Sequence, residues 1–221
     1  VRDPMVGPWQ VPVADCAVGL LDYRNHHGDA LSMGERSPVA VQDSAAASRL
    51  AIAESLTNLL SAVPDDLGQT KLSANWMADA GSAGQDAALY AAVEAASRLC
   101  IELGISIPVG KDSLSMRARW QGDDGQRVEV GSPVSLIVTA HAPVSDVRRA
   151  LTPEISPEMQ TSFILVDLGA GKQRLGGSAL AQITGRGGDP VPDLDDPQLL
   201  VKLWQAVREA QAEGLLLAYH D

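Results

Sequence analysis

Residues 43–63 read DSAAASRLAIAESLTNLLSAV, and this stretch does most to decide the fold. Asp43 is a favourable N-cap residue, so we expect a helix over residues 44–62 that ends before Pro64. At 100° per residue, one face of this helix collects the large apolar side chains. They are Ile52, Leu56, Leu59, Leu60 and Val63. The helix is therefore predicted to pack this face into a hydrophobic core.

The opposite face of the predicted helix carries mostly small residues around Glu54 and Asn58. These small residues are Ser44, Ala47, Ala51, Ser55 and Ser61. A solvated helix face usually holds long charged side chains, whereas small residues let another body approach closely. That body could be protein backbone or a ligand.

Glu54 and Asn58 are four residues apart, so their oxygen-bearing side chains project side by side. Asp15 is the one charge in an apolar segment predicted to be a strand, and it could supply a third oxygen ligand. Such a set suits Mg²⁺, which prefers a few hard oxygen ligands together with phosphates. The alternative interpretation is that Glu54 and Asn58 form a surface hydrogen-bonded pair while Asp15 caps a neighbouring backbone.

The sequence around this helix alternates between strand and helix patterns, which favours an α/β or α+β fold. We expect a helix over residues 85–103, ended by Gly104, and a loop over residues 22–38. The predicted strands cover residues 9–21, 71–76, 105–109 and 134–142, with a hairpin formed by 117–121 and 127–130.

The chain divides into a first unit over residues 1–143, a proline-containing linker over 144–161 and a second unit over 162–221. In the second unit we expect strands over 163–168 and 215–219, a glycine-rich loop over 169–177 and helices over 178–184 and 197–213. The chain starts at Val1 and ends beside a predicted strand, so we expect a piece of a longer polypeptide whose second unit is truncated.

The composition excludes several classes of protein. A net charge of −11 over 221 residues argues against a broad basic surface for nucleic acid or anionic lipid. No apolar run approaches the roughly 20 residues that a membrane-spanning helix needs. Cys16 and Cys100 lie in apolar segments and are predicted to be buried, reduced thiols, which favours a cytoplasmic protein. No G-x-S-x-G motif or Cys/His cluster indicates a hydrolase.

Residues 110–113, GKDS, directly follow a predicted buried strand. Backbone amides, a hydroxyl and an ammonium group at a strand end could hold a phosphate. The segment lacks the G-x-x-x-x-G-K pattern of a Walker A loop, so a plain turn remains the alternative.

Four longer sequence motifs are distinctive. They are MVGPWQVPVADCAV at 5–18, KLSANWMA at 71–78, SIPVGKDSLSM at 106–116 and AYHD at 218–221. Together they resemble the large single-chain form of the phosphoribosylformylglycinamidine synthase family, also called formylglycinamide ribonucleotide amidotransferase. The resemblance runs over essentially the whole chain. It covers only an internal part of that family's long polypeptide, in its second synthetase half.

The resemblance implies an aminoimidazole ribonucleotide synthetase-like fold, in which two related halves pair around a strand barrel. This chain would supply the N-terminal subdomain of the second half, a sheet with flanking helices, and the start of a C-terminal α+β subdomain. The complete enzyme would be a C–N ligase of purine biosynthesis that converts formylglycinamide ribonucleotide, glutamine and ATP to formylglycinamidine ribonucleotide. Its first half and glutaminase domain would be partners of this chain, which alone is expected to be inactive and to form a homodimer.

The resemblance also implies roles for individual residues. Asp15, Glu54, Asn58 and the final Asp221 would bind Mg²⁺ of an auxiliary ATP or ADP site, with Ala14 beside the nucleotide. Gly110, Lys111 and Ser113 would reach the catalytic site. Lys111 stands where related enzymes have an Asn ligand, so we expect it to contact phosphate and not metal. The alternatives are a purely structural nucleotide-binding module, or another superfamily member such as selenophosphate synthetase or thiamine-phosphate kinase.

Overall fold

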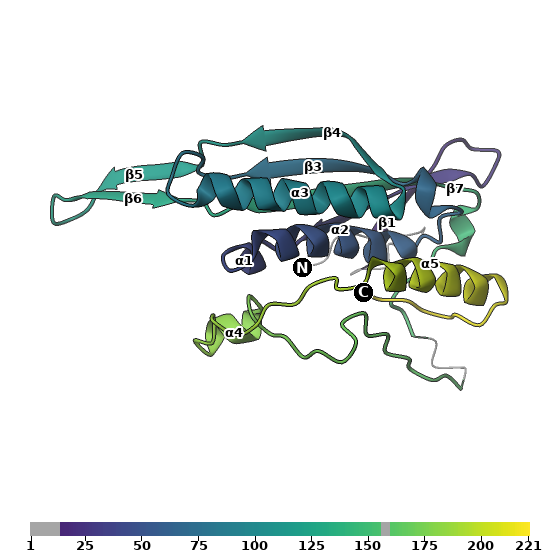
Figure 1. The fold of residues 1–221 in the computed structure, drawn as a ribbon. Coiled ribbons are helices and arrows are strands. Elements are labelled where there is room, and N and C mark those ends of the chain that lie inside the picture. Colours follow the sequence, from purple (N-terminus) through teal and green to yellow (C-terminus); the bar gives the residue numbers. More distant parts are fainter. Residues whose placement is uncertain (1–13, 156–159) are drawn as a thin grey trace.

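The computed structural model describes residues 14–155 and 160–221, and within them one mixed sheet carries a layer of helices on one face (Figure 1). The strands lie in the order β1-β2-β7-β3-β4, and every neighbouring pair is antiparallel except β3 and β4. Their bounds are β1 Cys16–Leu20, β2 Gly28–Glu35, β3 Lys71–Met77, β4 Ser106–Ser113 and β7 Ser135–Val144. The predicted α+β class is confirmed.

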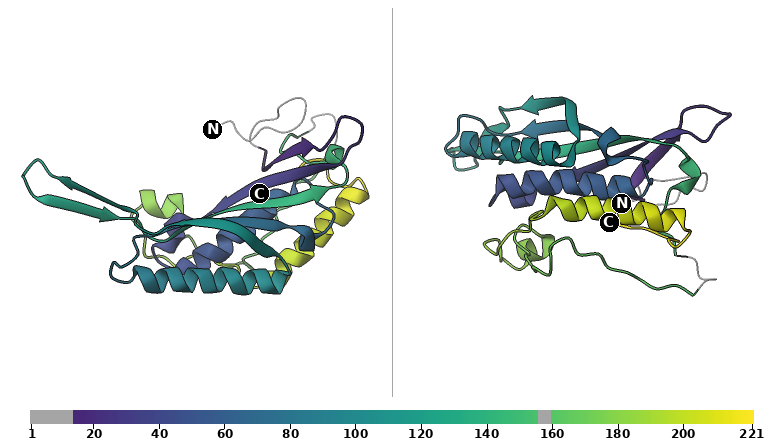
Figure 2. Two further views of the ribbon diagram at one scale, coloured as in Figure 1. Left: turned by 90° about the horizontal axis from the view of Figure 1, so that it is seen from above. Right: turned by 45° about the vertical axis from the view of Figure 1, so that its right-hand side comes forward.

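The helix layer is centred on α2 (Ser44–Leu60), with α3 (Gln85–Leu103) on one side and α5 (Pro197–Ala212) on the other (Figures 1 and 2). The Asp43 carboxylate accepts a hydrogen bond from the Ala46 amide over 2.9 Å, as the predicted N-cap requires. Gly104 ends α3 with a φ of 69°, which a glycine adopts without strain. The helix predictions are therefore confirmed, and the large apolar face of α2 is buried in the main core.

Strand β2 corrects the loop predicted for residues 22–38. Its buried positions hold small residues, and its exposed positions include Leu31 and Met33, so the usual alternation of large apolar and polar residues is absent. The reason is the close approach of α2. The Ser32 hydroxyl donates to the Ser55 carbonyl over 2.5 Å, and a Cβ at Gly34 would overlap the Ala51 carbonyl. The body that meets the small face of α2 is thus protein backbone.

Strand β4 corrects the second predicted loop, because residues 110–113 continue the strand instead of leaving it. They pair in parallel with β3, so that Gly110 lies opposite Ala74 and Lys111 opposite Asn75. A Cβ at Gly110 would overlap the Ala74 carbonyl oxygen. Gly110 therefore serves a close strand pairing, although glycine in a sequence usually signals a turn.

The other short elements include both confirmed and corrected predictions. The hairpin is confirmed as β5 (Arg117–Gln121) and β6 (Arg127–Gly131), and it projects from the end of the sheet (Figure 1). Helix α4 (Ala179–Ile183) and α5 also match their predictions, and a short α1 (Ser37–Ala40) precedes α2. Strand β1 begins at Cys16, and residues 9–13 of the predicted strand lie outside the described residues.

The predicted strands 163–168 and 215–219 are wrong, because neither segment has regular structure. Phe163, Ile164 and Leu165 are all more than 80% exposed. A strand needs a neighbour to accept its backbone hydrogen bonds, and neither segment belongs to a sheet among the described residues. The linker prediction for 144–161 is untested as a domain boundary, and residues 156–159 fall outside the described residues.

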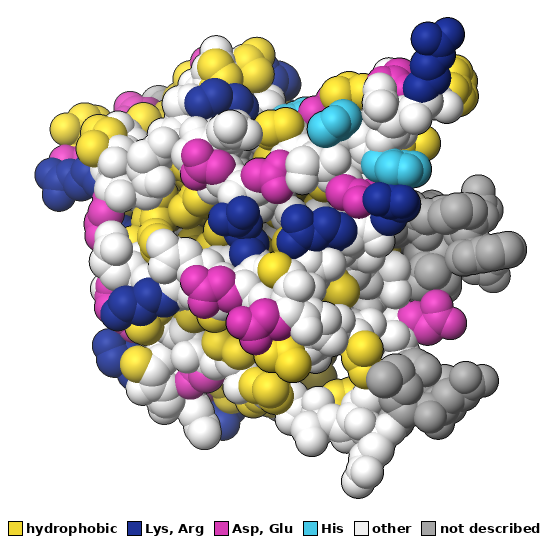
Figure 3. Space-filling view, turned by 90° about the vertical axis from the view of Figure 1, so that its right-hand side faces the viewer, with side chains coloured by type: hydrophobic (Ala, Val, Ile, Leu, Met, Phe, Trp, Pro, Cys, Tyr) yellow, Lys and Arg dark blue, Asp and Glu magenta, His cyan; other side chains and the backbone are white. Residues whose placement is uncertain are grey.

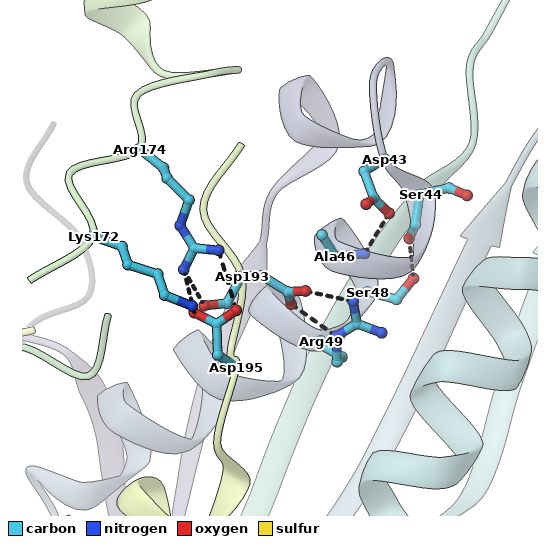
Figure 4. A network of polar contacts seen from close by, with 9 residues as sticks. All are labelled: Asp43, Ser44, Ala46, Ser48, Arg49, Lys172, Arg174, Asp193 and Asp195. Atoms are coloured by element: carbon cyan, nitrogen blue, oxygen red, sulfur yellow. Dashed lines mark hydrogen bonds and ion pairs between the residues drawn. The ribbon is translucent and has the colours of Figure 1, made fainter. Parts of the chain in front are cut away.

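Ion pairs hold the segment before α5 against α2 (Figure 4). The Arg49 guanidinium donates two hydrogen bonds to the Asp193 carboxylate, over 2.7 and 2.5 Å. Arg174 and Lys172 both pair with Asp195, at 2.6 and 3.2 Å. The Arg49–Asp193 pair thus joins this segment to α2, and the pairs with Asp195 join it to residues 172–174.

The surface of the described residues carries charges of both signs. Acidic and basic side chains are interspersed on the face shown in Figure 3. Within residues 14–155 and 160–221, no helix is long and apolar enough to cross a membrane.

We predict that Gly34→Ala destabilises the fold, because the new methyl group would overlap the Ala51 carbonyl. Overpacking of this kind costs about 1–3 kcal/mol of unfolding free energy. Gly19→Ala is the control, since no atom lies within 4 Å of a Cβ at that position. Urea denaturation of both variants measures the effect, and equal stability of the two would contradict the close α2–β2 contact.

We also predict that both cysteines are unreactive in the native protein. Cys16 and Cys100 are free and buried, and burial raises the pKa of each thiol to about 11. Only about one thiol in a thousand is then ionised at pH 8, and the thiolate is the reactive form. Titration with a disulfide reagent at pH 8 should label neither thiol before denaturation and both afterwards; rapid labelling of the native protein would oppose this assignment.

Candidate functional site

The Asp15 side chain, just before β1, is the most enclosed of the predicted metal ligands, with 4% of its surface exposed. Its Oδ1 lies 2.7 Å from His220 Nδ1 and accepts a long hydrogen bond of 3.4 Å from the Asp221 amide. Its Oδ2 is buried and has no hydrogen-bond partner among the described residues. Burial raises the pKa of Asp15, and the contact with His220 opposes that rise.

Glu54 and Asn58 both extend from α2 to the end of β2. Glu54 accepts a hydrogen bond of 2.7 Å from the Glu35 amide and forms an ion pair of 2.7 Å with Arg36. The Asn58 side-chain amide donates to the Met33 carbonyl over 2.9 Å. Burial raises the pKa of Glu54, while the Glu35 amide and Arg36 lower it. Each side chain therefore bonds to the backbone at the end of β2.

Asp221 completes the predicted set from the far end of the chain. Its backbone amide contacts Asp15. Burial is the main cause of the raised pKa of Asp15 and of Glu54, and the negative charge of Asp221 adds to both. Carboxylates raise one another's pKa when their negative charges repel, and a bound cation relieves that repulsion. Among the described residues, no three acidic, histidine or cysteine side chains lie close enough together to hold a metal ion as they stand. Ala14, predicted beside the nucleotide, is buried.

The second predicted set lies elsewhere on the sheet. Gly110, Lys111 and Ser113 belong to the edge strand β4, and the Lys111 ammonium donates to the Ser113 hydroxyl over 2.5 Å. Asp15 precedes β1, the opposite edge strand. Four strand spacings across the sheet amount to about 19 Å. The structure thus separates the β4 residues from the carboxylates.

Two relevant residues escaped the sequence analysis. His220 meets Asp15 across 204 intervening positions, and nothing local in the sequence indicates that contact. Asn75, opposite Lys111 on β3, has a buried side-chain oxygen without a partner among the described residues. Only the pairing register relates Asn75 to Lys111, and register could not be derived while residues 110–113 were interpreted as a loop.

Two surface hollows lie apart from both sets. One, of about 350 Å³, is lined by hairpin residues that include Trp120 and Arg127. The other, of about 380 Å³, lies between the end of α3 and α5 and is lined in part by Trp204 and Arg208. Neither is lined by a predicted site residue, so the site assignment rests on the carboxylates and on β4.

The chain is similar to one protein family and to several solved structures. The family model for the FGAR-AT PurM_N-like domain matches residues 1–143. Phosphoribosylformylglycinamidine synthase II from Thermotoga maritima is 18% identical, with a TM-score of 0.57 over 92% of this chain and 27% of that chain. PurL of the same organism complexed with ATP is 17% identical, with a TM-score of 0.54 over 95% of this chain and 28% of that one.

A third structure, T. maritima PurL complexed with FGAR, is 17% identical, with a TM-score of 0.53 over 90% of this chain and 26% of that chain. At these identities the likeness establishes the fold. This chain spans about a quarter of the length of the solved structures that it matches.

Proposed function

This chain belongs to the family of FGAR-AT PurM_N-like domains, and from that membership we propose that it is one synthetase subdomain of a phosphoribosylformylglycinamidine synthase. The complete enzyme would use ATP and glutamine to convert formylglycinamide ribonucleotide to formylglycinamidine ribonucleotide. The family match over 143 residues carries this proposal, and the shared fold over nine-tenths of the chain supports it. A cytoplasmic location fits such a role.

Within that enzyme, Asp15, Glu54, Asn58 and Asp221 would hold the Mg²⁺ of an auxiliary nucleotide site, with Ala14 beside the nucleotide. The supporting observation is the buried Oδ2 of Asp15, which has no partner within residues 14–155 and 160–221, while the other oxygen of Asp15 contacts His220 and the Asp221 amide. An isolated buried carboxylate oxygen is costly, and a cation would satisfy it. Asn58 uses its amide nitrogen on β2, which leaves its side-chain oxygen for the ion. The ion would neutralise nucleotide phosphates.

Gly110, Lys111 and Ser113 would serve a different site. The Lys111 ammonium is exposed on an edge strand, where it could contact a phosphate of ATP or of the substrate. The first synthetase half and the glutaminase domain would complete this catalytic site, so the chain alone would be inactive. Its two sheet edges, β1 and β4, could pair two isolated copies into a homodimer. The sheet separates the proposed Mg²⁺ ligands from Gly110, Lys111 and Ser113. This separation favours a structural role for the first set and a catalytic role for the second.

We predict that Glu54→Gln weakens Mg²⁺-dependent ADP binding by roughly tenfold or more. Glutamine keeps an acceptor for the Glu35 amide but loses the charge that the cation requires. Isothermal titration of the full-length protein with Mg²⁺ and ADP measures the change. Glu94→Gln is the matched control, because the partly exposed Glu94 of α3 has Arg98 as its one ion-pair partner among the residues that the structure describes. Equal affinities for the two variants would refute the auxiliary site.

We predict that Lys111→Ala lowers the glutamine-dependent synthase rate of the full-length enzyme on the order of tenfold to a hundredfold. The loss of an ammonium group that contacts phosphate would account for this decrease. Lys71→Ala, at an exposed position of the neighbouring strand, serves as the control. Steady-state kinetics with thermal melting would separate the two effects: loss of melting temperature without loss of rate would remove Lys111 from the active site.

A further inference from the structure

The C-terminal segment, residues 214–221, returns from α5 to the end of α2. Leu216 and Tyr219 from this segment pack against the main hydrophobic core. The segment forms no helix or strand, so individual contacts with the rest of the fold determine where it lies. Its last two residues are His220 and Asp221, which meet Asp15.

Tyr219 anchors this segment through two hydrogen bonds. Its hydroxyl donates to the Thr57 carbonyl of α2 over 3.0 Å. Its backbone amide donates to the Thr152 carbonyl, also over 3.0 Å.

The Thr57 carbonyl needs a donor from outside the helix. It lies in the last turn of α2, where helix carbonyls lose their usual amide partners. The Ser61 amide bonds to the Asn58 carbonyl over 3.3 Å. The Leu151 amide bonds to the Ser61 carbonyl over 2.7 Å. The Tyr219 hydroxyl therefore caps one of the free carbonyls at the end of α2.

The position of this cap matters because Thr57 lies between Glu54 and Asn58 in the sequence. The same tyrosine precedes His220 and Asp221, whose contacts with Asp15 measure 2.7 and 3.4 Å. One hydroxyl thus connects the helix that bears two predicted ligands to the segment that bears a third.

We propose that Tyr219 is a positioning residue: by docking on Thr57 of α2, it holds His220 and Asp221 against Asp15 and so preorganises the proposed ligands for a nucleotide-bound divalent cation. This inference rests on the proposed function of the carboxylates. It assigns Tyr219 no contact with the nucleotide.

The test compares Tyr219→Phe, which removes only the hydroxyl, with Tyr90→Phe, at a position 70% exposed on α3. In the full-length protein, isothermal titration gives the affinity for ADP with Mg²⁺, and amide hydrogen exchange reports on residues 216–221. For Tyr219→Phe we expect about tenfold weaker binding, the effect of losing one hydrogen bond, together with faster exchange. Tyr90→Phe should change neither quantity.

Two outcomes would overturn the inference, and they differ from failure of the proposed site. Faster exchange with unchanged affinity would make Tyr219 a structural anchor only, and no change in either quantity would remove its anchoring role. Glu54→Gln, measured in parallel, tests the site itself. Weaker binding in Glu54→Gln but not in Tyr219→Phe refutes the inference alone, whereas unchanged binding in Glu54→Gln refutes the site and the inference with it.

Discussion

The close contact between α2 and β2 is the constraint on which the rest of the structure depends. Glycine, alanine and serine on both elements let the backbones approach until a single added methyl at Gly34 would overlap the Ala51 carbonyl. Because α2 lies so near the strand, Glu54 and Asn58 can bond to the backbone of residues 33–35. The same contact leaves the large apolar face of α2 free to form the main core with α3 and α5.

The fold brings Asp221 to Asp15, which the sequence keeps far apart. Asp15 precedes the first strand, Glu54 lies on α2, and Asp221 ends the chain. Enclosing negative charges is unfavourable unless cations or hydrogen bonds compensate. His220 and Arg36 provide part of that compensation, and one oxygen of Asp15 receives none among the described residues. In the proposed function, a divalent cation with its nucleotide would supply the remainder.

Local signals in the sequence predicted much of this arrangement, and long-range contacts account for what they missed. Some features depend only on neighbours within one helical turn, so they could be predicted from the sequence. They are the N-cap Asp43, the terminal Gly104 and the i, i+4 spacing of Glu54 and Asn58. Strand β2 was missed because its inward-facing residues are small. Residues 110–113 were predicted to be a loop because glycine usually signals a turn, whereas Gly110 allows a close strand pairing. The segment 163–168 has strand composition without a partner strand. Asp221 entered the set only through the family resemblance, and the bond from Tyr219 to Thr57 leaves no sequence signal.

Native mass spectrometry of the full-length protein, wild type and Asp15→Asn, tests most directly whether the gathered carboxylates exist to bind a nucleotide with its cation. The account predicts that the wild-type protein carries the added mass of ADP or ATP with Mg²⁺, either as purified or after incubation with both. It predicts that Asp15→Asn, which keeps the shape of the side chain but lacks its charge, loses that mass. Absence of bound nucleotide from the wild type, or its full retention in the variant, would contradict the account.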